Sequence, residues 1–354
     1  MGYVFLVSGG LALLVPCVKV YKVDVERAVS ILSRAGVLDG RFKFGRLGDF
    51  VCIPVRDVGV ASGFLSGIVG FEVLELELEP RPVKPRGLSG VFEGLASYSL
   101  VGDIVVFNWR SEVPDVDVYR EAALHLMSEQ ARIKAAFLKR DTFGEFRVQR
   151  LIHLAGENRT RTIHREYGLS FHVDIARVYF NPRLASEHRR VAEEALDGDI
   201  VLDMFSGVGG FSVHVASLRK SRVVAVDVNP AATALAALNV AENRGKLKGK
   251  ITVLRADAAL LPLVLKPVFT RIIMNHPTAS KYYLGEACRL AEHHAIIYYY
   301  TRTINCKEAE IEVLERKGPC CRELEVVKCR SVLEYSPSHA IYNVTLKISK
   351  SPGT

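Results

Sequence analysis

A glycine-rich turn between two acidic residues stands where a nucleotide-like cofactor could bind. The segment Asp203-Met204-Phe205-Ser206-Gly207-Val208-Gly209 follows an apolar run, and Asp227 comes 20 residues after Gly207. Glycines let the backbone approach a ligand closely, and Asp227 can accept hydrogens from ribose hydroxyls. This spacing is equally compatible with a dinucleotide and with S-adenosylmethionine.

The carboxylate of Asp203 distinguishes these two cofactors. A dinucleotide places its pyrophosphate at the N-terminus of the helix that follows, where a neighbouring carboxylate would repel it. S-adenosylmethionine instead presents an ammonium and a sulfonium, which Asp203 can attract, while Asp257 can contact the adenine amino group. We therefore predict S-adenosylmethionine as the cofactor, bound by Asp203, Phe205, Gly207, Gly209, Asp227, Asp257 and Asn275.

A third group of residues follows the next predicted strand, in the segment Asn275-His276-Pro277. The carboxyl ends of parallel strands are where open α/β sheets carry their chemistry. Asn275 has both a donor and an acceptor and can read the edge of a nucleobase. Thr278 stands where methyltransferases of exocyclic amines carry a stacking aromatic, which disfavours that reaction. His276 is a candidate base or a spacer in a turn fixed by Pro277.

Basic residues crowd the chain between Arg132 and Arg165, where nine stand against three acidic ones. Such a run usually forms a solvated face, but its arginine bias and its place before the cofactor motif favour contacts with phosphates. We predict that the phosphates of a polyanion are bound here and at one residue outside the run, through Arg132, Lys139, Arg150, Arg159 and Arg183.

Alternating strands and helices must position these residues. From about residue 199 onward, apolar strand-like segments alternate with helical ones, which predicts a parallel sheet wrapped by helices. The last two strands, at about residues 323–335 and 341–348, predict an antiparallel hairpin. The first part of the chain reads as two smaller α+β units. The predicted boundaries are 1–70, 71–165 and 166–354, with a proline-rich linker after residue 78.

The amino-acid composition excludes several classes of protein. The 354 residues carry a formal charge of +8 and 49% hydrophobic residues, which excludes a single small module and wholesale disorder. The seven cysteines include no Cys-x-x-Cys pair, so we predict no metal site and no disulfide framework. No apolar run is long enough for a spanning helix. We expect a protein of the reducing cytoplasm, without membrane contact.

The residues beside these motifs form a signature. The chain resembles the tRNA (guanine-37-N1)-methyltransferases of archaea and eukaryotes, most strongly between Arg147 and Tyr300. The matching segments are Gly156-Glu157-Asn158-Arg159-Thr160, His164-Arg165-Glu166-Tyr167-Gly168, 174–184, Glu187, Asp203-Met204-Phe205 and Tyr299-Tyr300-Thr301. The resemblance implies a seven-stranded Rossmann-like core of the α/β class. Two departures are His276, which replaces a usual Leu, and Gly210, which replaces a frequent Pro.

The resemblance also implies a substrate and a mechanism. It implies a tRNA whose outer corner meets the first domain, whose anticodon stem-loop meets the other two, and whose guanine 3′ of the anticodon is flipped into the site. Guanine N1 must lose a proton before it can accept a methyl group. The matched positions make Glu187 the base and Arg147 the cation at O6, with Tyr179 beside the donor or the base. Asn275 and Pro277 complete the predicted catalytic set.

Two rival functions remain open at this point. An enzyme of the wyosine pathway could use the same cofactor on the same nucleotide, either to transfer a 3-amino-3-carboxypropyl group or to methylate the tricyclic base. A tRNA-binding module with a vestigial pocket is the rival from another class. The intact Asp203, Asp227, Asn275 and Glu187 argue against it. We expect the enzyme to be a monomer.

Overall fold

Two compact units divide the chain, Met1–Val91 and Phe92–Thr354. A computed structural model describes residues 13–79, 88, 92, 95, 98–143, 148–321, 323–334 and 338–349. In these residues no helix is long and apolar enough to cross a membrane.

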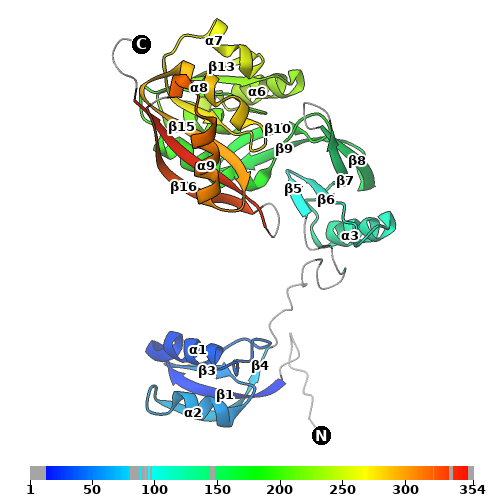
Figure 1. The fold of residues 1–354 in the computed structure, drawn as a ribbon. Coiled ribbons are helices and arrows are strands. Elements are labelled where there is room, and N and C mark those ends of the chain that lie inside the picture. Colours follow the sequence, from blue (N-terminus) through cyan, green and yellow to red (C-terminus); the bar gives the residue numbers. More distant parts are fainter. Residues whose placement is uncertain are drawn as a thin grey trace. The chain divides into compact units, whose positions relative to one another are not determined.

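The first unit is a four-stranded antiparallel sheet with two helices (Figure 1). The strand order is β2-β3-β1-β4. Ala28 and Leu32 of α1 and Ala61 and Leu65 of α2 pack on the same apolar cluster as Ile53 of β3. Both helices therefore cover one face of the sheet. The elements are β1 (Leu13–Tyr21), α1 (Val25–Arg34), β2 (Gly45–Leu47), β3 (Phe50–Pro54), α2 (Val58–Leu65) and β4 (Phe71–Leu78).

The strand β4 corrects the predicted boundary of this unit. It pairs with β1 in antiparallel register from Leu78 opposite Leu13 to Phe71 opposite Val20. The unit therefore extends beyond residue 70, because the sheet needs β4 as its edge strand. The predicted boundary at residue 165 also falls within a paired element, since β9 (Arg161–Glu166) forms a hairpin with β10 (Leu169–Asp174).

The second unit begins with another four-stranded sheet, in the order β5-β6-β7-β8. The strands β6 and β7 are parallel and are connected through α3, whereas the other two pairings are antiparallel. The hairpin β9–β10 links this sheet to the rest of the unit, because Gly102 and Asp103 donate backbone hydrogen bonds to His164 and Thr162. The elements are β5 (Tyr98–Val101), β6 (Ile104–Asn108), α3 (Val116–Glu129), β7 (Ala135–Phe143) and β8 (Val148–Gly156).

Asn239 of helix α6 (Pro230–Glu242) and Asn243, which follows the last residue of that helix, form hydrogen bonds with the unpaired edge of β10. The amide of Asn243 accepts from the N–H of Ser170 at 2.9 Å and donates to its carbonyl at 2.7 Å. Asn239 makes the same pair of bonds with His172, at 2.6 and 3.2 Å. These four hydrogen bonds hold the hairpin against α6.

The largest part of the second unit is a seven-stranded sheet in the order β13-β12-β11-β14-β15-β17-β16, in which β17 runs antiparallel to both neighbours (Figure 1). This confirms the predicted α/β class and the terminal hairpin. The apolar residues of α8 and α9 pack on one face and those of α4 and α5 on the other. The strands are β11 (Ile200–Asp203), β12 (Arg222–Asp227), β13 (Lys250–Arg255), β14 (Phe269–Met274), β15 (Ala291–Thr303), β16 (Leu324–Glu334) and β17 (Ala340–Ile348). The remaining helices are α4 (Ala185–Glu194), α5 (Gly210–Leu218), α7 (Leu261–Val264), α8 (Leu284–Leu290) and α9 (Cys306–Arg316).

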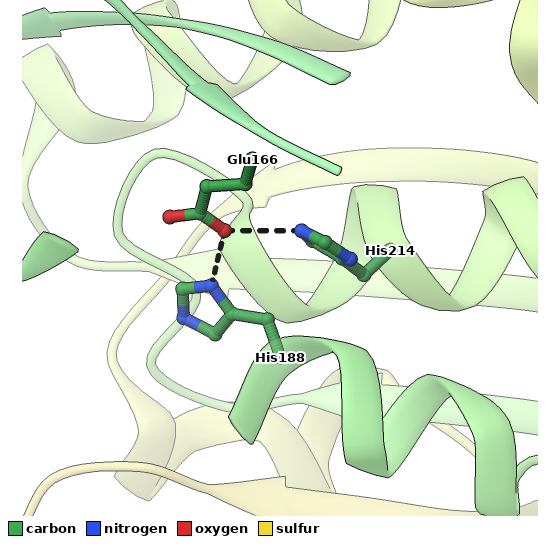
Figure 2. Close-up of side chains that lie close together, drawn as sticks. All are labelled: Glu166, His188 and His214. Atoms are coloured by element: carbon green, nitrogen blue, oxygen red, sulfur yellow. Dashed lines mark hydrogen bonds and ion pairs between the residues drawn. The ribbon is translucent and has the colours of Figure 1, made fainter. Parts of the chain in front are cut away.

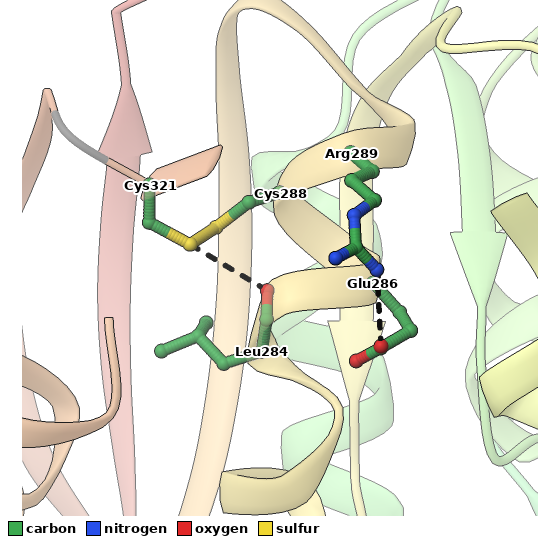
Figure 3. The surroundings of a disulfide bond; sticks show 5 residues. All are labelled: Leu284, Glu286, Cys288, Arg289 and Cys321. Carbon is green, nitrogen blue, oxygen red and sulfur yellow. Dashed lines mark hydrogen bonds and ion pairs between the residues drawn. A yellow bond between two sulfur atoms is a disulfide. The ribbon is translucent and has the colours of Figure 1, made fainter. Parts of the chain in front are cut away.

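Two disulfides overturn the expectation of a fully reduced chain. Cys288 of α8 is bonded to Cys321, and Cys306 of α9 to Cys329 of β16. Figure 3 shows the first of these, buried beside Leu284. The pairs are 33 and 23 residues apart in sequence. Such distant partners leave no spacing pattern, and for that reason the sequence did not reveal them.

Candidate functional site

A pocket of about 170 Å³ opens at the carboxyl ends of β11, β12, β13 and β14. This is the edge of the sheet where the strand order reverses, between β11 and β14. The pocket is lined by six residues that were predicted to bind the cofactor or to take part in catalysis and that follow these strands, namely Phe205, Gly207, Asp227, Asp257, Asn275 and Pro277. Tyr179 and His276 line it as well. The fold thus brings together residues that are far apart in the chain.

The glycine turn has the conformation that its sequence predicts. Gly207 and Gly209 have φ angles of 54° and 89°, in the left-handed region where a side chain is unfavourable. The N–H of Gly207 donates to Asp227 Oδ2 at 2.8 Å, so β12 holds the turn in place. Gly209 does not line the pocket itself, and it ends the turn immediately before α5.

Asp227 is an acidic residue in the lining of this pocket. Its second oxygen, Oδ1, accepts from the N–H of Asn229 at 2.9 Å. Burial raises the pKa of its carboxyl. Each oxygen keeps a further lone pair, which can accept a hydrogen bond from a ribose hydroxyl. Asp257 lines the pocket from the end of β13, where Oδ1 accepts from the N–H of Ala259 at 2.9 Å.

Asp203 is not among the residues that line the pocket. Its side chain is fully buried, and Oδ2 accepts from the hydroxyl of Ser212 at 2.8 Å. Burial raises the pKa of Asp203 to about 7. The predicted contact between this carboxylate and the cofactor stays a prediction, because Asp203 is not among the residues that line the pocket.

A hydrogen-bonded turn presents Asn275, His276 and Pro277. The carbonyl of His276 accepts from the N–H groups of Ala279 and Ser280 at 2.9 and 2.8 Å. The imidazole of His276 packs edge to face against Phe205, with the ring centres 5.3 Å apart. These contacts fix the turn beside the cofactor pocket, where the half-buried Asn275 can meet a base.

Glu187 is held by three side chains. On α4, Arg190 donates from Nε to Oε2 at 2.8 Å and from Nη2 to Oε1 at 2.6 Å. The hydroxyl of Tyr300 on β15 donates to Oε1 at 2.7 Å, and Arg330 on β16 donates to Oε2 at 3.2 Å. These donors outweigh the effect of burial and lower the pKa of Glu187. The carboxylate is 2% exposed and lies outside the lining of the pocket.

Sequence reasoning missed the partners of Glu187. Arg190 had a local signal, because residues three apart share one face of a helix. Arg330 had none, since it is 143 residues away and meets Glu187 only through the sheet. The predicted cation Arg147 lies outside the described residues.

A larger basic cleft, of about 1030 Å³, lies between the sheet β5–β8, the hairpin β9–β10 and α6. Arg165 and Arg177 line it with exposed guanidinium groups and have no ion pair within the described residues. Arg132 lines it too, and donates to the neutral Gln130 at 3.2 Å. The cleft also contains Arg159, Arg161, Asp103 and Asp174. Its net charge therefore favours an anion.

The predicted RNA contacts divide between this cleft and other surfaces. Arg159 lies in the cleft, but its guanidinium is paired with Asp103 at 2.5 Å and with Glu157 at 2.5 Å. Arg150 lies 3.8 Å from Asp141, outside the cleft. Lys139 and Arg183 are not among the lining residues either. Sequence reasoning did not single out Arg177, which has no basic neighbour in the chain.

Comparison with known proteins decides the family. Residues 162–327 match the TRM5/TYW2 methyltransferase domain, and residues 17–59 match the tRNA methyltransferase 5 N-terminal domain. The chain is 34% identical to the tRNA (guanine(37)-N(1))-methyltransferase Trm5b of Methanocaldococcus jannaschii, over 94% of this chain and 99% of that relative. The chain belongs to the TRM5/TYW2 methyltransferase family. This confirms the resemblance found in the sequence.

Other members of the TRM5/TYW2 family differ in the group they transfer. The tRNA(Phe) (4-demethylwyosine(37)-C(7)) aminocarboxypropyltransferase of M. jannaschii is 29% identical, over 68% of this chain and 93% of its own length. Among solved structures, the complex of aTrm5 with tRNALeu has a TM-score of 0.66 and 33% identity, and covers 94% of this chain and 99% of its own. Both kinds of transferase are therefore similar to this chain in sequence.

Proposed function

We propose that this protein transfers a methyl group from S-adenosylmethionine to N1 of guanine 37 in tRNA. The observation that carries the proposal is the pocket at the strand ends, where the Gly207 turn, Asp227 and the turn at Asn275 meet. Similarity to Trm5b over nearly the whole chain supports the choice of reaction. The acceptor is the guanine directly 3′ of the anticodon.

The residues of the pocket fit S-adenosylmethionine. The two oxygens of Asp227 can accept hydrogen bonds from the ribose hydroxyls, and Asp257 can accept one from the adenine amino group. The left-handed turn at Gly207 leaves room for the methionine part beside Phe205. When bound, the cofactor supplies a methyl group made electrophilic by a sulfonium.

The side chains of this protein prepare the guanine. Asn275 can donate to and accept from the edge of the base, and Tyr179 lines the same pocket. We propose that Glu187 takes the N1 proton and that Arg147 stabilises the negative charge that collects on O6. For Glu187 this requires the carboxylate to release Arg330, the donor at the longest distance, when the substrate enters.

We propose that tRNA is the macromolecular partner and that the basic cleft meets its phosphates. Arg132, Arg165 and Arg177 are exposed cations of that cleft that form no ion pair within the described residues. Their charges can replace counterions on the RNA, which makes binding depend on salt. We further propose that the enzyme acts as a monomer in the cytoplasm, with its two disulfides retained there as in some intracellular proteins of hyperthermophiles.

The test is the mass of the modified nucleoside. An unmodified tRNA transcript with guanine at position 37 is incubated with the enzyme and S-adenosylmethionine, digested and analysed by mass spectrometry. We expect 1-methylguanosine, and none from a matched transcript with adenine at position 37. If the guanine transcript gave no methylguanosine while a second tRNA, already carrying the tricyclic base at position 37, gained a 3-amino-3-carboxypropyl or methyl group, the wyosine-pathway activity would be assigned instead. Stoichiometric cofactor binding without any product would indicate a binding module.

A further inference from the structure

One buried carboxylate joins three elements next to the proposed active site. Glu166 ends β9, and its Oε2 is 2.8 Å from Nδ1 of His188 on α4 and 3.0 Å from Nε2 of His214 on α5 (Figure 2). The side chains of Glu166 and His214 are fully buried, and that of His188 is 7% exposed. The sequence motifs indicated no role for either histidine.

The geometry of this cluster indicates hydrogen bonds. Two ligands of a tetrahedral zinc ion lie about 3.3 Å apart, given bond lengths near 2.0–2.1 Å, whereas the two separations here are 2.8 and 3.0 Å. A histidine that binds a metal almost always donates its other ring N–H to an acceptor. Within the described residues Nδ1 of His214 has no such partner. We therefore interpret the cluster as three side chains joined by hydrogen bonds, and not as the ligands of a zinc ion.

The ring of His188 rests directly on the first residue of α5. A Cβ atom added to Gly210 would lie 2.6 Å from Cε1 and 2.8 Å from Nε2 of that ring. The ring also packs edge to face against Phe211, with centres 4.6 Å apart. Only glycine at position 210 lets the imidazole approach so closely, so the ring sets the distance between α4 and the start of α5.

The two helices joined in this way carry different parts of the proposed reaction. Glu187 directly precedes His188 on α4, and α5 begins directly after the turn of Gly207 and Gly209. The ring of His188 is thus packed between the helix that carries Glu187 and the start of the helix that follows this turn. Displacements of about 1 Å in a reacting geometry can slow a reaction by about 10²-fold.

We propose that His188 is a positioning residue for methyl transfer, held by Glu166 and seated on Gly210, which fixes Glu187 relative to the cofactor turn. The inference rests on the proposed function. Glu166 serves as the anchor, since its Oε2 accepts from both histidines. His214 shares the anchor, but it lies on α5 itself and its ring stacks on Phe171, whereas the atoms nearest to a Cβ at Gly210 are all from His188.

The test is a double-mutant cycle on His188 and Gly210. His188→Ala should lower the single-turnover methylation rate by about 10- to 100-fold at saturating RNA and cofactor. Its dissociation constant for S-adenosylmethionine, measured by calorimetry without RNA, should stay within about 3-fold. Gly210→Ala should slow the reaction in the wild-type background, because the methyl group displaces the ring. It should have little further effect after His188→Ala has removed that ring.

His214→Leu is the matched control. It removes the other hydrogen bond to Glu166, so it should lower the melting temperature as His188→Ala does but keep the rate within about 3-fold of wild type. A wild-type rate in folded His188→Ala, additive effects in the cycle, or an equal loss in His214→Leu would overturn the inference. So would zinc chloride, if it raised the melting temperature of the wild type but not of His188→Ala. If the wild type made no methylguanosine, the proposed function itself would fail instead.

Discussion

Replacing Tyr300 by phenylalanine should move the acid limb of the methylation reaction to higher pH. The hydroxyl of Tyr300 donates to Glu187 Oε1 at 2.7 Å, and both residues are buried. Phenylalanine keeps the ring and removes only this donor. Because the donors around Glu187 lower its pKa, the loss of one raises that pKa again. Glu187 can accept a proton only when it is ionised. When the pH is lowered, the variant should therefore lose activity at a higher pH than the wild type does.

The size of the shift follows from the bond that is removed. A hydrogen bond to a charged group contributes about 1.5–3 kcal/mol, and about 1.36 kcal/mol corresponds to one pH unit. The carboxylate is 2% exposed, so solvent screens the interaction little. The midpoint of the acid limb should therefore rise by about one to two pH units, with the plateau rate at neutral pH less affected.

The assay is single-turnover methylation of an unmodified tRNA transcript at saturating cofactor, over a series of acidic and neutral buffers. Tyr299→Phe is the matched control, because Tyr299 lies on the same strand and donates to Glu312 instead, at 2.7 Å. Its profile should coincide with that of the wild type. If Tyr300→Phe and the wild type lose activity at the same pH, ionisation of Glu187 does not limit the reaction, and the role of Glu187 as base would be refuted.

Four further predictions concern the cofactor, the base, the RNA and the fold. Asp227→Ala should weaken S-adenosylmethionine binding by about 1.5–3 kcal/mol for each hydrogen bond removed, and unchanged affinity in calorimetry would exclude it from the site. Glu187→Gln should slow single turnover by about 10²–10⁴ without weakening RNA binding in a filter assay, and alkaline pH should partly restore the rate. Reversing the charges of Arg132 and Lys139 should lower the slope of the logarithm of the RNA-binding constant against the logarithm of salt concentration by roughly 0.7–0.9 for each phosphate that is no longer neutralised. An unaltered slope would show that neither residue contacts a phosphate. Reducing the two disulfides should lower the free energy of unfolding by about 2–4 kcal/mol each, measured by urea denaturation with and without reductant.

Local patterns predicted the parts of the site that lie within one loop. The left-handed glycines, Asp227 at the end of the next strand and the turn at Asn275 could be placed because strand, turn and helix follow each other in the chain. In a parallel sheet the ends of such strands meet at one edge, so the pocket followed from the order of elements. The α/β class followed from the same alternation.

Contacts between distant elements could not be predicted in this way. Arg330 meets Glu187 only because β16 joins the sheet through β17, and no spacing in the chain encodes that approach. The first unit was predicted to end too early, because the glycines between residues 59 and 70 resembled a linker, whereas β4 follows them and pairs with β1. For Asp203 the residue type and its place at a strand end could be predicted. No local pattern indicated that Ser212 would donate to its carboxylate.

The asparagines that bind β10 have a consequence for the state of the free protein. An exposed strand edge has unpaired N–H and C=O groups that can pair with a strand of another protein molecule, and such pairing leads to aggregation. Asn239 and Asn243 are one helical turn apart, about 6 Å along α6, which nearly matches the spacing of Ser170 and His172 along a strand. The two amides therefore substitute for a neighbouring strand at an edge that would otherwise be open. Aspartate at either position would lack the N–H donor, so the enzyme would be left with a surface that can recruit strands from other chains.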